Sequence, residues 1–306
     1  MEDTGNTIWF KNLPNRNRKG VDMELDRCKE IERSIIKRYR KSIWRPFIRG
    51  IQEYDLIQDG DKIAVCISGG KDSMLLAKLL QEVQRHGKMD FELKFLSMDP
   101  GYNEKNRQKL LSNAELLNVP LDMFHTDIFD IVHGVDGNPC YLCARMRRGC
   151  LYKNAQDLGC NKIALGHHFD DVIETILMGM MYGGQIQTMM PKLHSTNFPG
   201  MELIRPMYLI KEEDIITWRD YNKLEFLQCA CRFTESISES QDGVGESKRQ
   251  EMKELIKQLR ATSDVIDRNI FRSVHDVNLD TLIGYHRGEE RYNFLDDYEE
   301  RGKKIY

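Results

Sequence analysis

The sequence contains no apolar run close to the roughly 20 residues that a membrane-spanning helix needs, which argues against an integral membrane protein. Its first residues, MEDTGNTIWFKNLP, lack the apolar core of a secretion signal, and eight cysteines are too few for a disulfide scaffold in 306 residues. We find neither internal repeats nor low-complexity tracts. We therefore expect a cytoplasmic protein in a reducing compartment, where clustered thiols indicate metal binding or catalysis.

A strong net charge is also missing, because 45 Lys and Arg residues face 48 Asp and Glu residues, for a total of −3. This total hides an asymmetry. Residues 1–49 contain 13 basic against 7 acidic residues, a local excess of +6. Because nucleic-acid binding depends on the local field, this basic segment can still contact phosphates. The same charges also suit an ordinary solvated helix face, and the sequence leaves both interpretations open.

Alternating strands and helices are predicted after residue 61. Apolar runs predict strands at 62–67, 91–98, 122–126 and 162–166. Helical spacing of apolar residues predicts helices at 22–48, ending near Pro46, and at about 71–83, 104–117, 144–158, 170–181 and 248–259. The alternation predicts a doubly wound α/β fold with a mainly parallel sheet. We expect a basic N-terminal helical region at 1–55, the α/β domain at 56–235 and a helical C-terminal appendage at 236–306.

A glycine turn joins the first predicted strand to its helix. It consists of Ser68, Gly69, Gly70, Lys71, Asp72 and Ser73. Two glycines allow close backbone approach, and successive amides at a helix start form an anion nest that the helix dipole strengthens. The turn differs from a Walker A loop, because Val65 stands where the first glycine is needed and Asp72 follows the lysine. It therefore predicts a phosphate-binding loop of another kind.

A second polar loop, Gly166-His167-His168-Phe169-Asp170-Asp171, follows the fourth predicted strand. Because ligands bind at the carboxyl ends of parallel strands, its histidines and carboxylates are candidates for holding Mg²⁺ or orienting phosphates. The alternative is helix capping, with Asp170 as N-cap and Glu174 favoured by the dipole. Beside the glycine turn, the binding site is the favoured interpretation.

The cysteines divide into two close pairs and four single residues. Cys140 and Cys143 form a C-x-x-C, and Cys229 and Cys231 form a C-x-C. Alone, the first pair fits a redox dithiol or half a zinc site, whereas C-x-C is tight for one zinc. Three thiolates with an open position suit an iron–sulfur cluster that has one exposed iron. We predict core packing for Cys28, Cys66, Cys150 and Cys160.

The hexapeptide SGGKDS resembles the signature of the PP-loop, or adenine nucleotide α-hydrolase-like (HUP), superfamily. This resemblance implies cleavage of ATP between the α and β phosphates, with AMP activating a carbonyl oxygen. Further matching segments are CYLCARMRRG, KIALGHHFDD, YGG, MPKL and IRP, in the same order and spacing. With them, the chain from about residue 22 to 235 resembles the tRNA 2-thiocytidine biosynthesis (TtcA) family.

The resemblance implies an ATP-dependent tRNA sulfurtransferase that forms AMP and pyrophosphate. The C2 oxygen of an anticodon-loop cytidine would be adenylated and replaced by sulfur, giving 2-thiocytidine. The implied cofactors are ATP, Mg²⁺ and a 4Fe–4S cluster, and the implied partners are tRNA and a sulfur donor, either sulfide or a cysteine desulfurase. A homodimer is left open. The implied catalytic residues are Lys71, Asp72 and Asp171. The implied ATP-binding residues are Ser68, Gly69, Gly70, Lys71, Asp72, Ser73, Asp99, Gly166, His167 and Asp170.

The family's cluster ligands match Cys140 and Cys143, with a third cysteine from a later C-x-x-C. This chain has C-x-C there, one residue shorter, so Cys231 is favoured and Cys229 is the alternative. Arg147, Arg148 and Arg205 are candidate contacts for the phosphates of RNA or ATP, or belong to a solvated face. Two rival functions stay open. One is a PP-loop sulfurtransferase acting on another nucleotide or a small molecule, and the other is a non-catalytic iron–sulfur or nucleotide-sensing protein.

Overall fold

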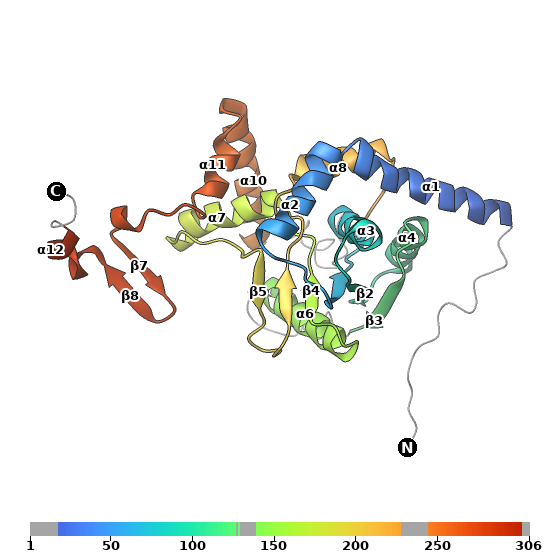
Figure 1. Cartoon of the computed structure of the whole chain (residues 1–306), viewed down its shortest axis with the longest axis horizontal. Coiled ribbons are helices and arrows are strands. Elements are labelled where there is room, and N and C mark those ends of the chain that lie inside the picture. Colours follow the sequence, from blue (N-terminus) through green and yellow to red (C-terminus); the bar gives the residue numbers. More distant parts are fainter. Residues whose placement is uncertain (1–17, 127, 129–138, 228–243, 302–306) are drawn as a thin grey trace, which may run out of the picture. The chain divides into compact units, whose positions relative to one another are not determined.

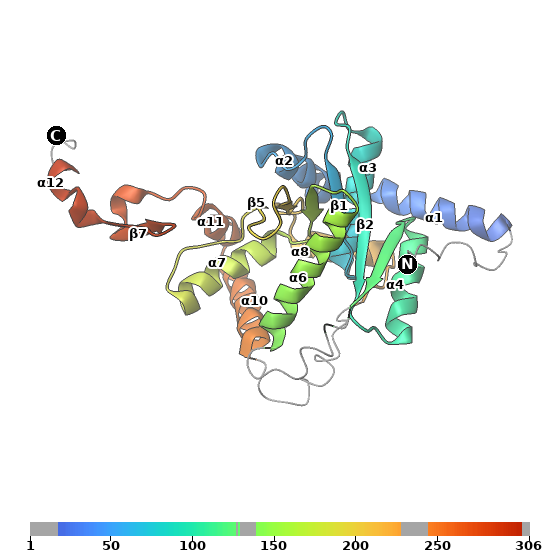
Figure 2. The same cartoon turned by 90° about the horizontal axis from the view of Figure 1, so that it is seen from below.

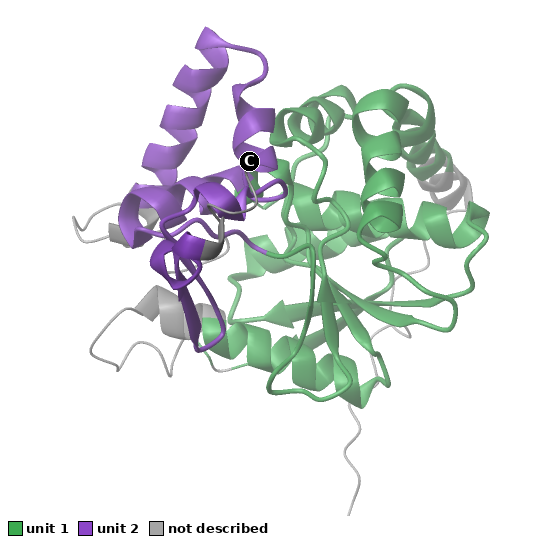
Figure 3. Ribbon diagram, turned by 60° about the vertical axis from the view of Figure 1, so that its left-hand side comes forward, with its two compact units in different colours: residues 1–172, 190–244 green, residues 173–189, 245–306 purple. Residues whose placement is uncertain are grey.

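The computed structural model describes residues 18–126, 128, 139–227 and 244–301 (Figure 1). The chain divides into two compact units, Met1–Val172 with Met190–Val244 and Ile173–Met189 with Gly245–Tyr306 (Figure 3). The three-part division at 1–55, 56–235 and 236–306 stays a prediction. Within the described ranges, no helix has both the length and the apolar character that crossing a membrane requires.

A six-stranded sheet forms the centre of the first unit, in the order β3-β2-β1-β4-β6-β5. Its strands are β1 (Lys62–Cys66), β2 (Glu92–Asp99), β3 (Leu121–His125), β4 (Lys162–Ala164), β5 (Lys192–His194) and β6 (Glu202–Ile204). Every pairing is parallel except that of β5 with β6 at the edge. The predicted, mainly parallel sheet is confirmed. Sequence patterns missed β5 and β6, because neither segment shows the uninterrupted apolar run that marks 163–165: Leu193 stands alone between Lys192 and His194, and Glu202 interrupts the apolar residues around it.

Helices cover both faces of the sheet, as a doubly wound fold requires. They are α3 (Lys71–His86), α4 (Glu104–Leu116), α6 (Pro139–Asp157) and α8 (Glu212–Tyr221). A further helix, α7 (Phe169–Gly183), begins in the first unit, and its residues from Ile173 onward belong to the second unit. One core joins β1 to α3, α4 and α8, and includes Leu75, Leu110 and Trp218. A second core joins β1, β2 and β4 to α6 through Tyr152 and Ala155. Figure 2 shows α6 in front of the strands and α3 behind them.

The N-terminal segment is α1 (Arg18–Lys37), a π-helical turn η1 (Arg40–Trp44) and α2 (Arg45–Glu53). The sequence predicted one continuous helix at 22–48, and this prediction is wrong, because two α-helices joined by a π-helical turn occupy the segment. In η1 the Trp44 amide donates to the Tyr39 carbonyl five residues back. Pro46 lies in the first turn of α2 and not near a helix end, because proline needs no amide partner there.

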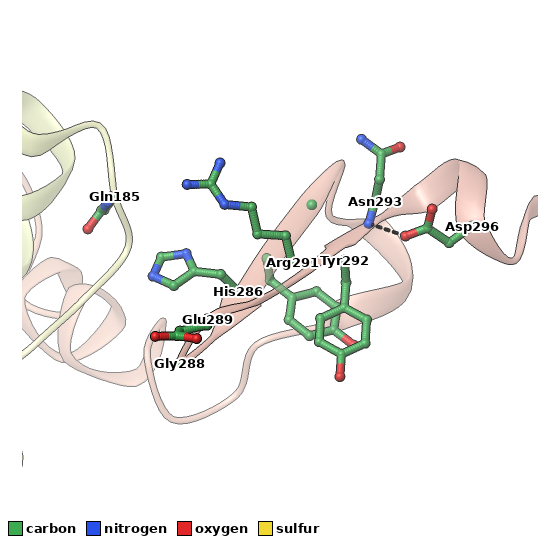
Figure 4. Close-up of a pocket in the computed structure, with 10 residues that line it drawn as sticks. Gln185, His286, Gly288, Glu289, Arg291, Tyr292, Asn293 and Asp296 are labelled. Carbon is green, nitrogen blue, oxygen red and sulfur yellow. Dashed lines mark hydrogen bonds between the residues drawn. The ribbon is translucent and has the colours of Figure 1, made fainter.

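The second unit contains α10 (Val244–Thr262), α11 (Ile266–Arg272), the hairpin β7–β8 (Gly284–Arg287 and Glu290–Asn293) and α12 (Tyr298–Arg301). The hairpin is an addition to the helical appendage predicted from the sequence. It lines an open pocket of about 890 Å³ (Figure 4). The pocket presents His286 and Arg291, and the Asn293 amide donates to Asp296 at its edge, at 2.8 Å. None of the predicted site residues lines it.

Candidate functional site

The glycine turn between β1 and α3 is a cradle of backbone amides. Gly69 has φ +84°, a left-handed conformation that favours glycine. The Ser73 hydroxyl accepts from the Ser68 amide and hydroxyl, both at 3.2 Å, and donates to the Gly70 carbonyl at 3.0 Å. Gly70 is the N-cap of α3 and provides no capping side chain. The first amides of α3 are therefore left for an anion, as at other phosphate-binding helix starts.

The two predicted loops meet at the switch point of the sheet. β1 and β4 are neighbours, but the chain continues from β1 to β2 on one side, while β6 lies on the other side of β4. Ligands of open α/β sheets bind at such a point. A Cβ atom on Gly166 would lie 3.1 Å from the Ser73 amide nitrogen and 3.1 Å from the Asp72 carbonyl carbon. Gly166 therefore permits the close approach of its loop to the start of α3.

Lys71 lies between two carboxylates. Its Nζ is 2.9 Å from Glu212 Oε1 and 3.2 Å from Asp72 Oδ2, and its side chain is 19% exposed. Burial lowers the pKa of Lys71, but the two carboxylates outweigh burial and leave the pKa raised. Glu212 was missed by sequence reasoning. The available signal was the acidic first turn of α8, which follows β6, a strand without an uninterrupted apolar run.

His168 is buried among acidic side chains of the same site. Its Nδ1 lies 3.5 Å from Asp171 Oδ2, and its Nε2 lies 3.9 Å from Asp72 Oδ1 and 4.0 Å from Glu212 Oε1. Oδ2 of Asp171 also accepts a hydrogen bond from the backbone amide of His168, at 3.0 Å. Asp72 Oδ1 is buried and has no hydrogen-bond partner among the described residues. The structure thus brings Lys71, Asp72 and Asp171 into one cluster around His168.

Two other predicted residues hold the backbone around the cradle. Asp170 accepts the Glu212 amide at 2.6 Å and so ties α7 to the first turn of α8. Asp99 ends β2 next to β1, where its Oδ1 accepts the amides of Gly101 and Tyr102 at 2.9 and 2.8 Å. His167 is half-buried beside Gly166. These three residues lie at the predicted edge of the sheet, and their contact with ATP stays a prediction.

Arginines add positive charge to the same unit. Arg148 is exposed on α6 and Arg147 is half-buried. Arg205 is buried and donates to the Met190 carbonyl. Burial, followed by the positive charge of Arg148, lowers the pKa of Arg205 to about 10. Arg148 and Arg205 therefore repel each other, and a phosphate between them would relieve this repulsion.

The structure describes six of the eight cysteines, namely the C-x-x-C pair and the four single cysteines for which we predicted core packing. Cys140 and Cys143 lie in the first turn of α6, and their three-residue spacing places both Cα atoms on one side of the helix. Cys229 and Cys231 lie outside the described residues. Cys28, Cys66 and Cys160 are buried, Cys150 is half-buried, and all four are free. Burial raises the pKa of Cys66 to about 12, as expected for an inert packing thiol.

This fold and this cradle define an ATP-binding domain of the PP-loop class, and the family model described as PP-loop domain matches residues 39–232. A tRNA-cytidine(32) 2-sulfurtransferase of Geobacter sulfurreducens is 32% identical over 243 residues, covering 78% of this chain and 91% of the relative. The chain belongs to the PP-loop family and, within it, to the tRNA-cytidine(32) 2-sulfurtransferase family. The resemblance inferred from the sequence motifs is confirmed.

In other relatives, the aligned region covers a smaller share of the relative's length. The tRNA-cytidine(32) 2-sulfurtransferase of Neisseria meningitidis is 40% identical over 185 residues, which are 58% of this chain and 57% of that protein. The chain thus spans little more than half the length of this relative. Among solved structures, a U34-tRNA thiolase, NcsA from Methanococcus maripaludis, with its 4Fe–4S cluster, has a TM-score of 0.56 at 21% identity. The similarity covers 90% of this chain and 87% of NcsA, and it shows a shared fold.

Proposed function

We propose that this protein is a cytoplasmic, ATP-dependent tRNA sulfurtransferase that converts an anticodon-loop cytidine to 2-thiocytidine. The main support is that the glycine turn and the Gly166 loop lie together at the switch point of the sheet. The second support is that the chain belongs to this family. The cytidine C2 oxygen attacks the α-phosphorus of ATP and pyrophosphate leaves. AMP leaves when sulfur takes the place of the C2 oxygen.

The residues of the cradle fit this role in binding ATP. The first amides of α3 bind phosphate oxygens, and Lys71 supplies a cation next to them. Among the described residues, no group of three or more His, Cys, Asp or Glu side chains is arranged to hold a metal ion. Mg²⁺ needs no such cage, because it commonly binds nucleotide phosphates and one or two carboxylates. The unpartnered Oδ1 of Asp72 suits it, with Asp171 as the second carboxylate.

Cys140, Cys143 and Cys231 are the proposed ligands of a 4Fe–4S cluster, with Cys229 as the alternative third ligand. The chemistry of the donor set fits, because thiolates are the usual ligands of such clusters and the C-x-x-C lies in one helical turn. Held by three of these thiolates, such a cluster would supply an iron to which the incoming sulfur can bind. Sulfide or a cysteine desulfurase is the proposed source. Arg147 and Arg148 follow on the same helix, and they are the proposed contacts for phosphates of tRNA or ATP.

Pyrophosphate release with and without tRNA tests the proposal. We expect release that depends on tRNA and on the glycine turn, and that is lost in Lys71→Ala. Release with a small acceptor alone would instead indicate a small-molecule sulfurtransferase. No release with any RNA would indicate a nucleotide-sensing protein.

A further inference from the structure

Exposed cations recur at a fixed spacing along α1, η1 and α2. Within residues 26–49, eight basic side chains are exposed, against only two exposed acidic ones, Asp26 and Glu30. Six of the cations stand four residues apart, so consecutive members on one helix are separated by a rise of about 6 Å. We call these eight residues the cationic strip. It consists of Lys29, Arg33, Lys37, Arg38, Arg40, Lys41, Arg45 and Arg49.

Most of this charge has no counter-charge within the described part of the chain. Arg49 approaches Glu53 at 4.0 Å, and the Arg38 guanidinium lies 4.4 Å from the centre of the Tyr221 ring. The other six cations form no ion pair with described residues. A solvated helix face usually mixes charges of both signs. A row of one sign instead matches a polyanion.

Aromatic rings accompany the strip. Tyr221 is 53% exposed and contacts Arg38 on its face and the Tyr39 ring at a centroid distance of 6.0 Å. RNA differs from other polyanions in offering unpaired bases that stack on such rings and on guanidinium planes. The combination of unpaired cations and an exposed tyrosine therefore favours RNA over an acidic protein.

The middle of the strip is attached to the helix that borders the cradle. Ser42 of η1 donates to Asp214, and the Tyr39 hydroxyl donates to the Thr217 carbonyl at 2.8 Å. Asp214 lies two residues after Glu212, which binds Lys71. The segment that carries Arg40 and Lys41 is thus attached to the same helix, α8, whose first turn contacts the lysine of the cradle. Figure 1 shows α1 and α2 in blue beside α8.

The strip is also held rigidly on the first unit. Glu32 of α1 is nearly buried, and its carboxylate lies 2.6 Å from Lys78 Nζ and 2.6 Å from Arg85 Nη2, both on α3. Since α3 begins at the cradle, α1 and the phosphate-binding turn are fixed to the same helix. A polyanion on the strip would therefore keep a defined register relative to the cradle.

We propose that the cationic strip binds the sugar–phosphate backbone of the RNA substrate and positions it for the reaction. This assignment rests on the proposed function, because it takes tRNA as the substrate. The contacts are independent of the RNA sequence, as backbone contacts are, and fix the position of the RNA without selecting the base.

Two triple variants with the same change of net charge test the strip. The strip variant carries Lys29→Gln, Lys37→Gln and Lys41→Gln. The control variant carries Lys88→Gln, Lys153→Gln and Lys257→Gln, which are exposed lysines outside the strip. The readout is the dissociation constant of transcribed tRNA, measured by fluorescence anisotropy over a series of KCl concentrations. Thermal unfolding and ATP binding of both variants verify that they are folded.

We expect the strip variant to bind tRNA about tenfold more weakly or worse, with a salt slope shallower by roughly 2 to 3, because each lost phosphate contact removes about 0.9. The control variant should stay close to wild type. Equal affinities and slopes in the two variants, or no binding of tRNA by the wild type, would overturn the assignment.

Formation of 2-thiocytidine by the wild type separates the two proposals. If the wild type binds tRNA through the strip but makes no 2-thiocytidine, the strip stands and the proposed function fails. If the wild type makes 2-thiocytidine while the strip variant binds as the control does, the strip alone fails.

Discussion

Replacing Glu212 by glutamine should tighten the binding of ATP. The Glu212 carboxylate lies 2.9 Å from the Lys71 ammonium, so a phosphate must compete with it for the same cation. Glutamine keeps the size and a hydrogen-bonding oxygen but removes the negative charge. Lys71 stays protonated at neutral pH, since Asp72 remains beside it at 3.2 Å.

The size of the effect follows from the contact. Both side chains are partly buried, 19% exposed for Lys71 and 23% for Glu212, so water screens the pair incompletely. A hydrogen bond to a charged group contributes about 1.5–3 kcal/mol, of which glutamine retains a part. We therefore expect a gain of about 1–2 kcal/mol for ATP, or a dissociation constant roughly 5 to 30 times lower.

Isothermal titration calorimetry with ATP, without tRNA, measures this gain. Glu213→Gln is the matched control, because Glu213 is the next residue, is exposed and pairs with Lys211 at 3.8 Å and not with Lys71. It removes the same charge from the same helix start. Equal ATP affinity in the two variants, or weaker binding in Glu212→Gln, would refute the competition for Lys71.

Three further predictions concern the backbone, the ion pairs and the thiols. Gly166→Ala should weaken ATP binding about tenfold or more in the same calorimetry, because its Cβ would press on the backbone of α3, whereas Gly183→Ala, with open space around it, should not. Glu32→Gln should lower the free energy of unfolding by roughly 3 kcal/mol at neutral pH, because its partners on α3 outweigh burial and lower the pKa of Glu32 from 4.5 to about 2. Since the folded-state pKa is the lower one, that stability is complete above pH 4.5 and is lost as the pH falls toward 2, so urea unfolding of variant and wild type should converge over this window. Cys140→Ala should abolish both cluster absorbance and thiolation in anaerobically purified protein, whereas the packing variant Cys160→Ala should keep the absorbance; full activity of Cys140→Ala would rule out the cluster.

The two loops of the site could be predicted from the sequence, because each follows an uninterrupted apolar run and carries a distinctive set of glycine and polar residues. The parallel strand order then places both loops at one edge, and this is what the structure shows for the glycine turn and Gly166. Glu212 could not be predicted in the same way. It meets Lys71 across 141 positions of the sequence, and Glu202 interrupts the apolar residues of the strand before it, so no apolar run marks that strand.

The break between α1 and α2 was hidden for a different reason. Apolar residues continue at three- and four-residue steps through Ile35, Tyr39 and Ile43, so the pattern is that of one helix. The π-helical turn adds a residue to the turn without disturbing the buried face, since Ile43 remains fully buried. Periodicity reports which face is buried and is insensitive to this kind of local change in hydrogen bonding.

The nucleosides of tRNA provide the decisive measurement. Anaerobically purified protein is incubated with tRNA, ATP, Mg²⁺ and sulfide, and the digested tRNA is analysed by mass spectrometry. We expect 2-thiocytidine to appear in an amount that matches the pyrophosphate released, and to be absent with Lys71→Ala. Pyrophosphate release without any thiolated nucleoside, or 2-thiocytidine formed without ATP, would contradict ATP-dependent thiolation of tRNA by this protein.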